Sequence, residues 1–118
     1  MVSRQKKKGT AFESAFVDYE RAFFDDTEGA IRRLAMSGAN DCGDVGGLYA
    51  HGLKIAVECK DRRRYELREW LSEAERERGN YDADLGVVVF HLNGVGVARM
   101  GEQAVLMTVD TFNRLIGG

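Results

Sequence analysis

The sequence predicts an α/β fold, in which a mixed β-sheet is flanked by α-helices. Two observations support this prediction. Segments with helical and strand patterns follow one another in the order helix, β-hairpin, helix, strand, strand, helix. In addition, residues 86–92 (GVVVFHL) form a continuous apolar run, which is typical of a strand buried on both faces of a sheet.

The length and composition limit the chain to one domain. It has 118 residues, of which 44% are hydrophobic, enough for one core. No apolar run approaches the roughly 18 residues of a membrane span, and no signal-peptide pattern opens the chain. We therefore expect a cytoplasmic protein (in the host cytoplasm if phage-encoded) without a membrane partner. Its two cysteines, Cys42 and Cys59, lack metal-type spacing and are expected to be reduced thiols.

The charge distribution is more informative than the net charge of -2. Residues 1–8 are basic, and we expect them to form a flexible arm before a single domain over residues 9–118. A second basic group follows the hairpin. Basic patches bind phosphate backbones, although scattered charges on a solvated surface are the alternative. The residues expected to grip DNA phosphates are Lys6, Lys7, Lys8, Arg62, Arg63 and Arg64.

The first half of the chain predicts a helix, a loop and a hairpin. A helix is expected over about residues 10–25, and Thr10 to Glu13 fits a capping box at its start. Its expected buried stripe contains Phe12, Phe16, Tyr19 and Phe23. A short helix or strand around residues 30–36 and a loop rich in turn formers (SGANDCGD) come next. The hairpin follows over about residues 44–60.

The second half predicts a helix over residues 66–78, which ends at Gly79 in a left-handed conformation. Its expected buried face contains Leu67, Trp70, Leu71 and Ala74. After the strand at 86–92 we expect weaker strands at 96–100 and 104–109, and a short helix capped by Asp110. His91 follows the buried strand and is expected to be structural.

The hairpin contains the most informative residues. A tight turn around residues 50–52 places Asp44 opposite Glu58, and Lys60 follows two residues later on the same face. Two carboxylates about 5 Å apart repel by about 3 kcal/mol at an effective dielectric of about 20. A divalent cation would offset this repulsion. The alternative is that Glu58 and Lys60 form the solvent face of an edge strand and that Asp44 is a turn residue.

At these residues the sequence resembles the PD-(D/E)XK nuclease superfamily, and more closely the small Holliday junction resolvases of archaea and phages. The resemblance covers roughly residues 6–92. It consists of KKKGTAFE with Gly9 and Glu13, the Ser37–Gly38 pair, the aspartate of GD and the strand-terminal ECK. Two departures are Gly43, where the family has proline, and a second aspartate, Asp41, which is an alternative to Asp44 as metal ligand.

The resemblance implies a restriction-endonuclease-like fold and a site for Mg²⁺, for which Mn²⁺ would substitute. The implied ligands are Asp44, Glu58 and the backbone carbonyl of Cys59. Glu13 would complete the metal site, unless it serves only the capping box. Lys60 would position the attacking water and stabilise charge on the phosphate.

Ser37 would contact DNA, or be a plain loop hydroxyl.

We therefore expect a metal-dependent endonuclease that cleaves branched DNA, most specifically a Holliday junction resolvase in recombination and repair. A homodimer is expected, because a junction with near two-fold symmetry needs two nicks. The alternatives are another nuclease of this superfamily, such as a nickase or repair endonuclease, and a nucleic-acid-binding module without activity. The sequence leaves open the branch preference, the cellular metal and the dimer surface.

Overall fold

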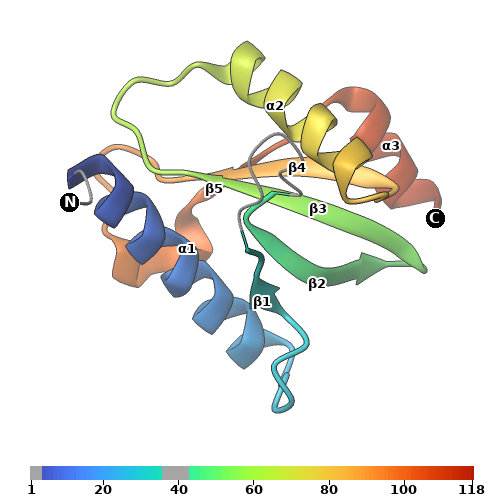
Figure 1. Ribbon diagram of the computed structural model, residues 1–118, viewed down its shortest axis with the longest axis horizontal. Helices are drawn as coiled ribbons and strands as arrows, with labels where there is room; N and C mark the ends of the chain where they lie inside the picture. Colours follow the sequence, from blue (N-terminus) through green and yellow to red (C-terminus); the bar gives the residue numbers. More distant parts are fainter. Residues whose placement is uncertain (1–3, 36–42) are drawn as a thin grey trace.

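The computed structural model describes residues 4–35 and 43–118, without the side chains of residues 4–8. One mixed sheet has the strand order β1-β2-β3-β4-β5, with β3 and β4 parallel and the other neighbours antiparallel (Figure 1). The strands are β1 (Arg32–Arg33), β2 (Val45–Ala50), β3 (Leu53–Lys60), β4 (Leu85–Phe90) and β5 (Ala104–Leu106). The predicted mixed sheet flanked by helices is confirmed.

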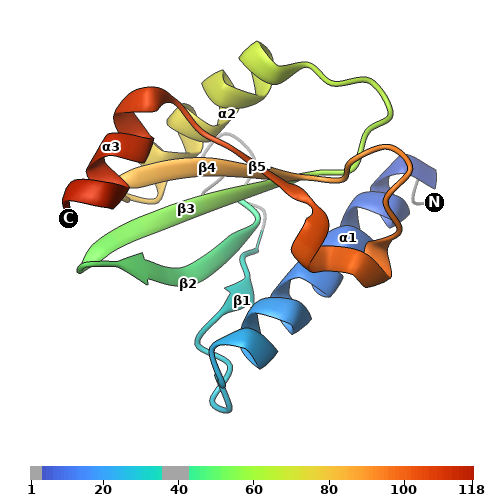
Figure 2. The same ribbon diagram turned by 180° about the vertical axis from the view of Figure 1, so that it is seen from behind.

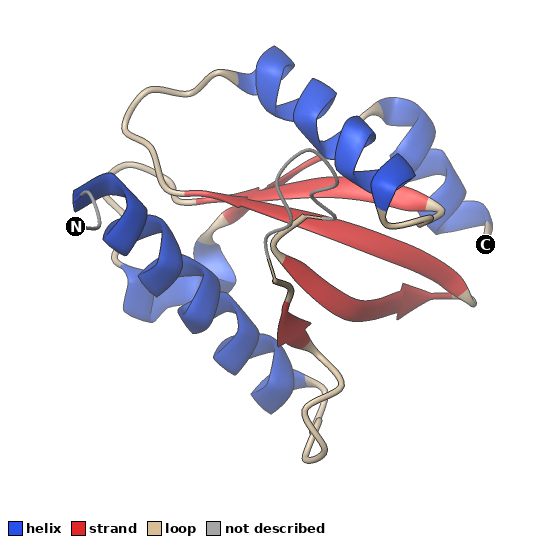
Figure 3. Ribbon diagram, in the orientation of Figure 1, coloured by secondary structure: helices blue, strands red, loops and turns tan. Residues whose placement is uncertain are grey.

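Helices cover both faces of the sheet (Figure 3). Helix α1 (Arg4–Phe23) lies on one face, and α2 (Leu67–Asn80) lies on the other, beside α3 (Val109–Gly117). The core under α1 contains Phe12, Phe16, Val17, Val57, Cys59, Val87 and Val89. The core under α2 contains Trp70, Ala74, Val88 and Phe90. Strand β4 contributes to both cores, which confirms that it is buried on both faces.

The β2–β3 hairpin contains a bulge that sets the register near its open end. A two-residue turn at His51 and Gly52, both with positive φ, joins the strands. Ile55 pairs with Leu48, but Val57 pairs with Val45, so two glycines of β2 face one residue of β3. The extra residue brings Asp44, just before β2, level with Glu58. The predicted pairing at this end is therefore correct, although the turn is one residue shorter than expected.

Helix α1 begins at Arg4, well before the expected start, and therefore includes residues 4–8 of the expected arm. Thr10 lies inside this helix, so the predicted capping box is wrong. The lysines before Gly9 are good helix formers, and nothing in that run stops a helix. The buried stripe of this helix is also shorter than predicted, since Tyr19 is 40% exposed and Phe23 is 69% exposed. The last turns of α1 extend past the edge of the core.

Two predictions for the end of the chain are corrected. The expected strand at 96–100 is a 3₁₀ helix, η2 (Val97–Glu102), in which Arg99 pairs with Glu102 across one turn. Thr108 caps α3 in place of Asp110, because its side chain accepts a hydrogen bond from the Thr111 amide.

Helix α2 also differs from the prediction at both ends. It continues through Gly79 to Asn80, and Gly79 does not have the left-handed φ that was expected. The first turn extends beyond the core, so Leu67 is exposed and not buried.

Two glycine substitutions test this account of α2 and its packing. Gly79 is exposed within the helix, and no described atom lies within 4 Å of an added Cβ, so Gly79→Ala should stabilise by about 0.5–1 kcal/mol. A Cβ at Gly86 of β4 would lie 2.9 Å from the Ala74 carbonyl oxygen of α2. Gly86→Ala should therefore destabilise by about 1–3 kcal/mol. Urea unfolding measures both, and a destabilised Gly79→Ala would contradict a continuous α2.

Candidate active site

A cavity of about 240 Å³ lies where β3 ends, against the first half of α1. It brings together the four residues predicted to be catalytic, which come from separate places in the sequence. The lining residues are Gly9, Thr10, Glu13, Arg33, Leu34, Asp44, Glu58, Cys59, Lys60, Asp61 and Arg62. Backbone pairing between β2 and β3 stops at Val45 and Val57, so the last three residues of β3 pair with β4 but have no strand on the side of β2.

Asp44 takes the place of the missing strand. Its backbone amide donates to the Val57 carbonyl at 2.8 Å, and its Oδ2 accepts a hydrogen bond from the Cys59 amide at 2.7 Å. The side chain is buried, and this bond holds one carboxylate oxygen in place. The sequence predicted the position of Asp44 relative to Glu58, but not this contact with the backbone.

The backbone of Cys59 points into the same region. The next carbonyl, that of Lys60, accepts from the His91 amide and thus points towards β4. Successive residues of a strand point their amides and carbonyls to opposite sides. The Cys59 carbonyl therefore points away from β4, to the side on which its amide meets Asp44. This orientation agrees with the predicted role of the carbonyl as a ligand, while the thiol is buried in the core under α1.

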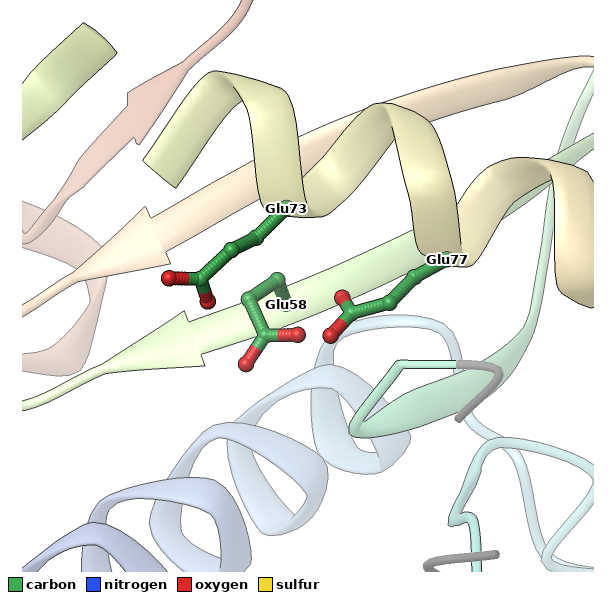
Figure 4. Close-up of side chains that lie close together, drawn as sticks. All are labelled: Glu58, Glu73 and Glu77. Carbon is green, nitrogen blue, oxygen red and sulfur yellow. The ribbon is translucent and has the colours of Figure 1, made fainter. Parts of the chain in front are cut away.

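Glu58 lies at the centre of a group of acids. Two glutamates of α2, Glu73 and Glu77, point towards it, with Glu58 between them (Figure 4). Carboxylate oxygens of the three residues lie within 4.8 Å of one another. Burial, followed by contact with Glu77 and Asp44, raises the pKa of Glu58 far above its usual range. No hydrogen-bond donor among the described residues reaches the buried Oε2 of Glu58.

Glu13 enters the cavity from α1. Its Oε2 accepts a hydrogen bond from Arg33 Nε at 3.2 Å. Burial and the neighbouring Asp44 raise the pKa of Glu13 to about 7, and Arg33 opposes this change only in part. Glu13 is thus part of the acidic site, as the resemblance implied, and not of a helix cap.

Lys60 is held by α2. Its ammonium is 2.6 Å from Glu73 Oε2 and 3.9 Å from Glu58 Oε1. Burial disfavours the charge, but the hydrogen bond to Glu73 and the nearby Glu58 outweigh burial, so the pKa of Lys60 lies above its usual value. Lys60 is therefore a cation beside the acids, and Glu73 is the residue that orients it.

The donor atoms suit a divalent cation. Asp44, Glu58 and the Cys59 carbonyl offer hard oxygen ligands, which Mg²⁺ and Mn²⁺ prefer, and Glu13 adds a further carboxylate. The buried Oε2 of Glu58 has no donor among the described residues, and the raised pKa values show that the acids are not fully offset by Arg33 and Lys60. A bound cation would supply the missing positive charge, so the residues fit the predicted metal.

A basic cavity of about 390 Å³ adjoins the acidic one. Lys60 and Arg62 line both cavities and therefore lie where the two adjoin. Arg63 and Arg64 line the basic cavity alone, and all three arginines are exposed. Because guanidinium groups match phosphate oxygens, these residues are well placed to hold a nucleic-acid backbone beside the acids.

His91 has a structural environment. Its Nδ1 is 2.9 Å from Asp61 Oδ1, its Nε2 contacts the Val95 carbonyl, and its ring stacks on Phe12. These contacts tie the chain after β4 to the chain after β3. The expectation that His91 is structural agrees with this geometry.

Several predicted residues lie outside what the structure describes. Ser37, Asp41 and Cys42 are beyond the described ranges, and only the backbone is described for Lys6, Lys7 and Lys8, within α1.

Three site residues were not predicted from the sequence: Arg33, Glu73 and Glu77. The two glutamates had a detectable signal, because each follows a buried residue of α2 by three positions and therefore lies on the side of the helix that faces the sheet. Arg33 had no such signal, since β1 is a two-residue strand.

Comparisons with protein-family models, curated proteins and solved structures gave no match for this chain. The nuclease resemblance thus stays a prediction from the motifs and the site. In the part of the chain that the structure describes, no helix has the length and apolar character needed to cross a membrane.

The raised pKa of Glu13 predicts a pH-dependent stability. A carboxyl group whose pKa is higher in the folded state stabilises fully below its unfolded value of 4.5, and this contribution is lost as the pH rises through about 7. The melting temperature of Glu13→Gln minus that of the wild type should therefore increase from pH 5 to pH 8. Calorimetry without divalent metal measures this difference.

Glu75→Gln is the matched control, because hydrogen bonding to Arg78 lowers the pKa of Glu75. That residue stays ionised from pH 5 to pH 8, so the difference between Glu75→Gln and the wild type should be constant. An equally constant difference for Glu13→Gln would show that Glu13 does not share the acidic site.

Proposed function

We propose that the protein is a metal-dependent endonuclease that cleaves branched DNA, with four-way junctions as its substrate. One observation carries the proposal: Glu13, Asp44, Glu58 and Lys60 line one cavity, beside a basic cavity that suits a phosphate backbone. The preference for branched DNA comes from the resemblance to Holliday junction resolvases. A homodimer and a role in recombination or repair belong to the same proposal.

The reaction is hydrolysis of a phosphodiester by in-line attack of water. When bound, Mg²⁺ would activate water and offset the negative charge that develops on the phosphate. Asp44 and Glu58 would hold the cation, with the Cys59 carbonyl as a third ligand. Glu58 must lose its proton before it can bind a cation, so cation binding should strengthen as the pH rises.

Lys60 would stabilise charge on the phosphate. Its bond to Glu73 holds the ammonium where the two cavities adjoin. Arg62 also lines both cavities, and Arg63 and Arg64 line the basic cavity alone. A DNA strand held by the arginines would thus bring one phosphate next to Lys60.

Cleavage assays test the catalytic residues. Asp44→Asn, Glu58→Gln and Lys60→Ala should each lower the cleavage rate by about a hundredfold or more, because each removes a ligand or charge at the reacting phosphate. Binding should persist, since other residues hold the backbone. The assay compares a labelled four-way junction with the matching linear duplex, in Mg²⁺ and in EDTA, and measures binding separately.

Asp82→Asn is the matched control, since Asp82 is exposed and asparagine tolerates its positive φ. It should cleave like the wild type. Binding of the junction without cleavage in Mg²⁺ or Mn²⁺ would favour the non-catalytic binding module. Equal cleavage of junction and duplex would favour another nuclease of this class.

The arginines of the basic cavity predict a change in salt dependence. Converting Arg62, Arg63 and Arg64 to alanine should weaken DNA binding and flatten the slope of log K against log salt by about 0.9 for each lost phosphate contact. The rate at saturating DNA should also fall, because Arg62 lines the catalytic cavity. Arg76→Ala, an exposed change on α2, should leave the slope unchanged. An unaltered slope in the triple variant would show that DNA does not bind in the basic cavity.

A further inference from the structure

Helix α3 presents three of its four apolar side chains to solvent, and the fourth, Leu115, is half-buried. Val109, Phe112 and Ile116 recur at helical spacing on one side, and they are 74%, 52% and 67% exposed. In α3, all of which the structure describes, no residue is buried. An amphipathic helix on a globular protein normally turns its apolar side to the core. Here that side is uncovered.

The polar side of α3 faces the molecule instead. Arg114 Nη1 donates to the Asp84 carbonyl at 2.9 Å, at the start of β4. Asp110, Thr111 and Arg114 line a polar cavity between α3 and α2. These contacts fix the orientation of the helix, so its apolar side cannot turn inwards without breaking them.

Strand β5 is the last strand of the sheet, so one of its edges is open. Figure 2 shows β5 and α3 on the side of the molecule nearest the viewer. Val105 of β5 points to the α1 face of the sheet, since Ala104 and Leu106 pack against the core under α2, so it is not part of the apolar side of α3. Val109, Phe112 and Ile116 are together called the α3 surface below. An open sheet edge beside an apolar helix is a template for association.

We propose that the α3 surface binds a second copy of this chain across a two-fold axis. The area agrees with a dimer. A stable interface buries about 800 Å² per partner, of which about 60% is apolar, and the three side chains expose on the order of 300 Å². They therefore supply most of the apolar part of such an interface, and polar neighbours supply the rest.

The surface is also suited to meet itself. Its three residues carry no charge, so two copies bury no like charges when they pack together. Antiparallel packing of α3 against α3 places Val109 of one copy near Ile116 of the other and brings the two Phe112 rings close to the axis.

The location leaves both catalytic cavities open. Helix α3 packs near Asp84, at the start of β4, whereas the cavity lies beside the end of β3, which runs parallel to β4. The need for two active sites comes from the proposed function, but the association itself needs no DNA. Experiments can therefore contradict the dimer proposal and the nuclease proposal independently of each other.

Sedimentation of the full chain without DNA tests the proposal. The wild type should be a dimer at micromolar concentrations, and Phe112→Glu should raise the dimer dissociation constant at least a hundredfold, because it places a charge at the axis. Phe112 is half exposed, so this variant should fold, which circular dichroism and the melting temperature verify. Phe23→Glu is the matched control, since Phe23 is equally apolar, 69% exposed and distant in sequence. It should remain a dimer.

A second variant, Ile116→Lys, should dissociate the dimer in the same way. A wild type that stays monomeric to about 200 µM would overturn the proposal, because an interface of this area associates well below that concentration. A dimer that Phe23→Glu dissociates, but Phe112→Glu and Ile116→Lys do not, would place the interface on α1 and would equally overturn it.

Discussion

The hydrogen bond from the Cys59 amide to Asp44 Oδ2 is the contact on which the candidate site depends. It lies at the point where β2 stops and β3 continues, so a side chain replaces the missing strand. The same bond positions one carboxylate beside Glu58 and leaves the Cys59 carbonyl pointing to that side. Loss of this bond would leave the Cys59 amide without its partner and would also release Asp44 from its place beside Glu58. The end of the sheet and the acidic site are therefore one structural unit.

The acids of this unit are held closer together than their charges favour. Glu58 meets Asp44 on one side and Glu77 of α2 on the other, and the two cations nearby, Arg33 and Lys60, offset only part of the charge. Burial beside these acids raises the pKa of Glu58 far above its usual range. The apolar cores on both faces of the sheet, with Val57 on one face and Val88 on the other, stabilise the fold and offset the repulsion between these acids. The fold therefore holds the acids in an arrangement that is unfavourable by itself.

The sequence predicted those features that depend on local pattern and strand register. The order of elements and the buried strand β4 follow from periodicities of two or of 3.6 residues. The pairing of Asp44 with Glu58 was predicted from the position of the turn, and it holds because the bulge offsets the shorter turn. It did not predict which end of α1 extends past the core, so Phe23 was expected to be buried. It also missed Glu77: its spacing from Ala74 places this glutamate on the sheet side of α2, but only the fold shows that Glu58 lies across from it. Tertiary contacts decide both.

Because β2 contains a bulge, the number of residues in the hairpin does not by itself determine whether Asp44 lies opposite Glu58. Two glycines there face one residue of β3, and Gly47 has a backbone conformation and a close approach to the Ala30 carbonyl that exclude a side chain. A hairpin one residue shorter, without the bulge, would bring Asp44 level with Glu58 just as well. Related chains can therefore differ in length between this aspartate and the glutamate, and a search that requires constant spacing between them would overlook relatives with the same site.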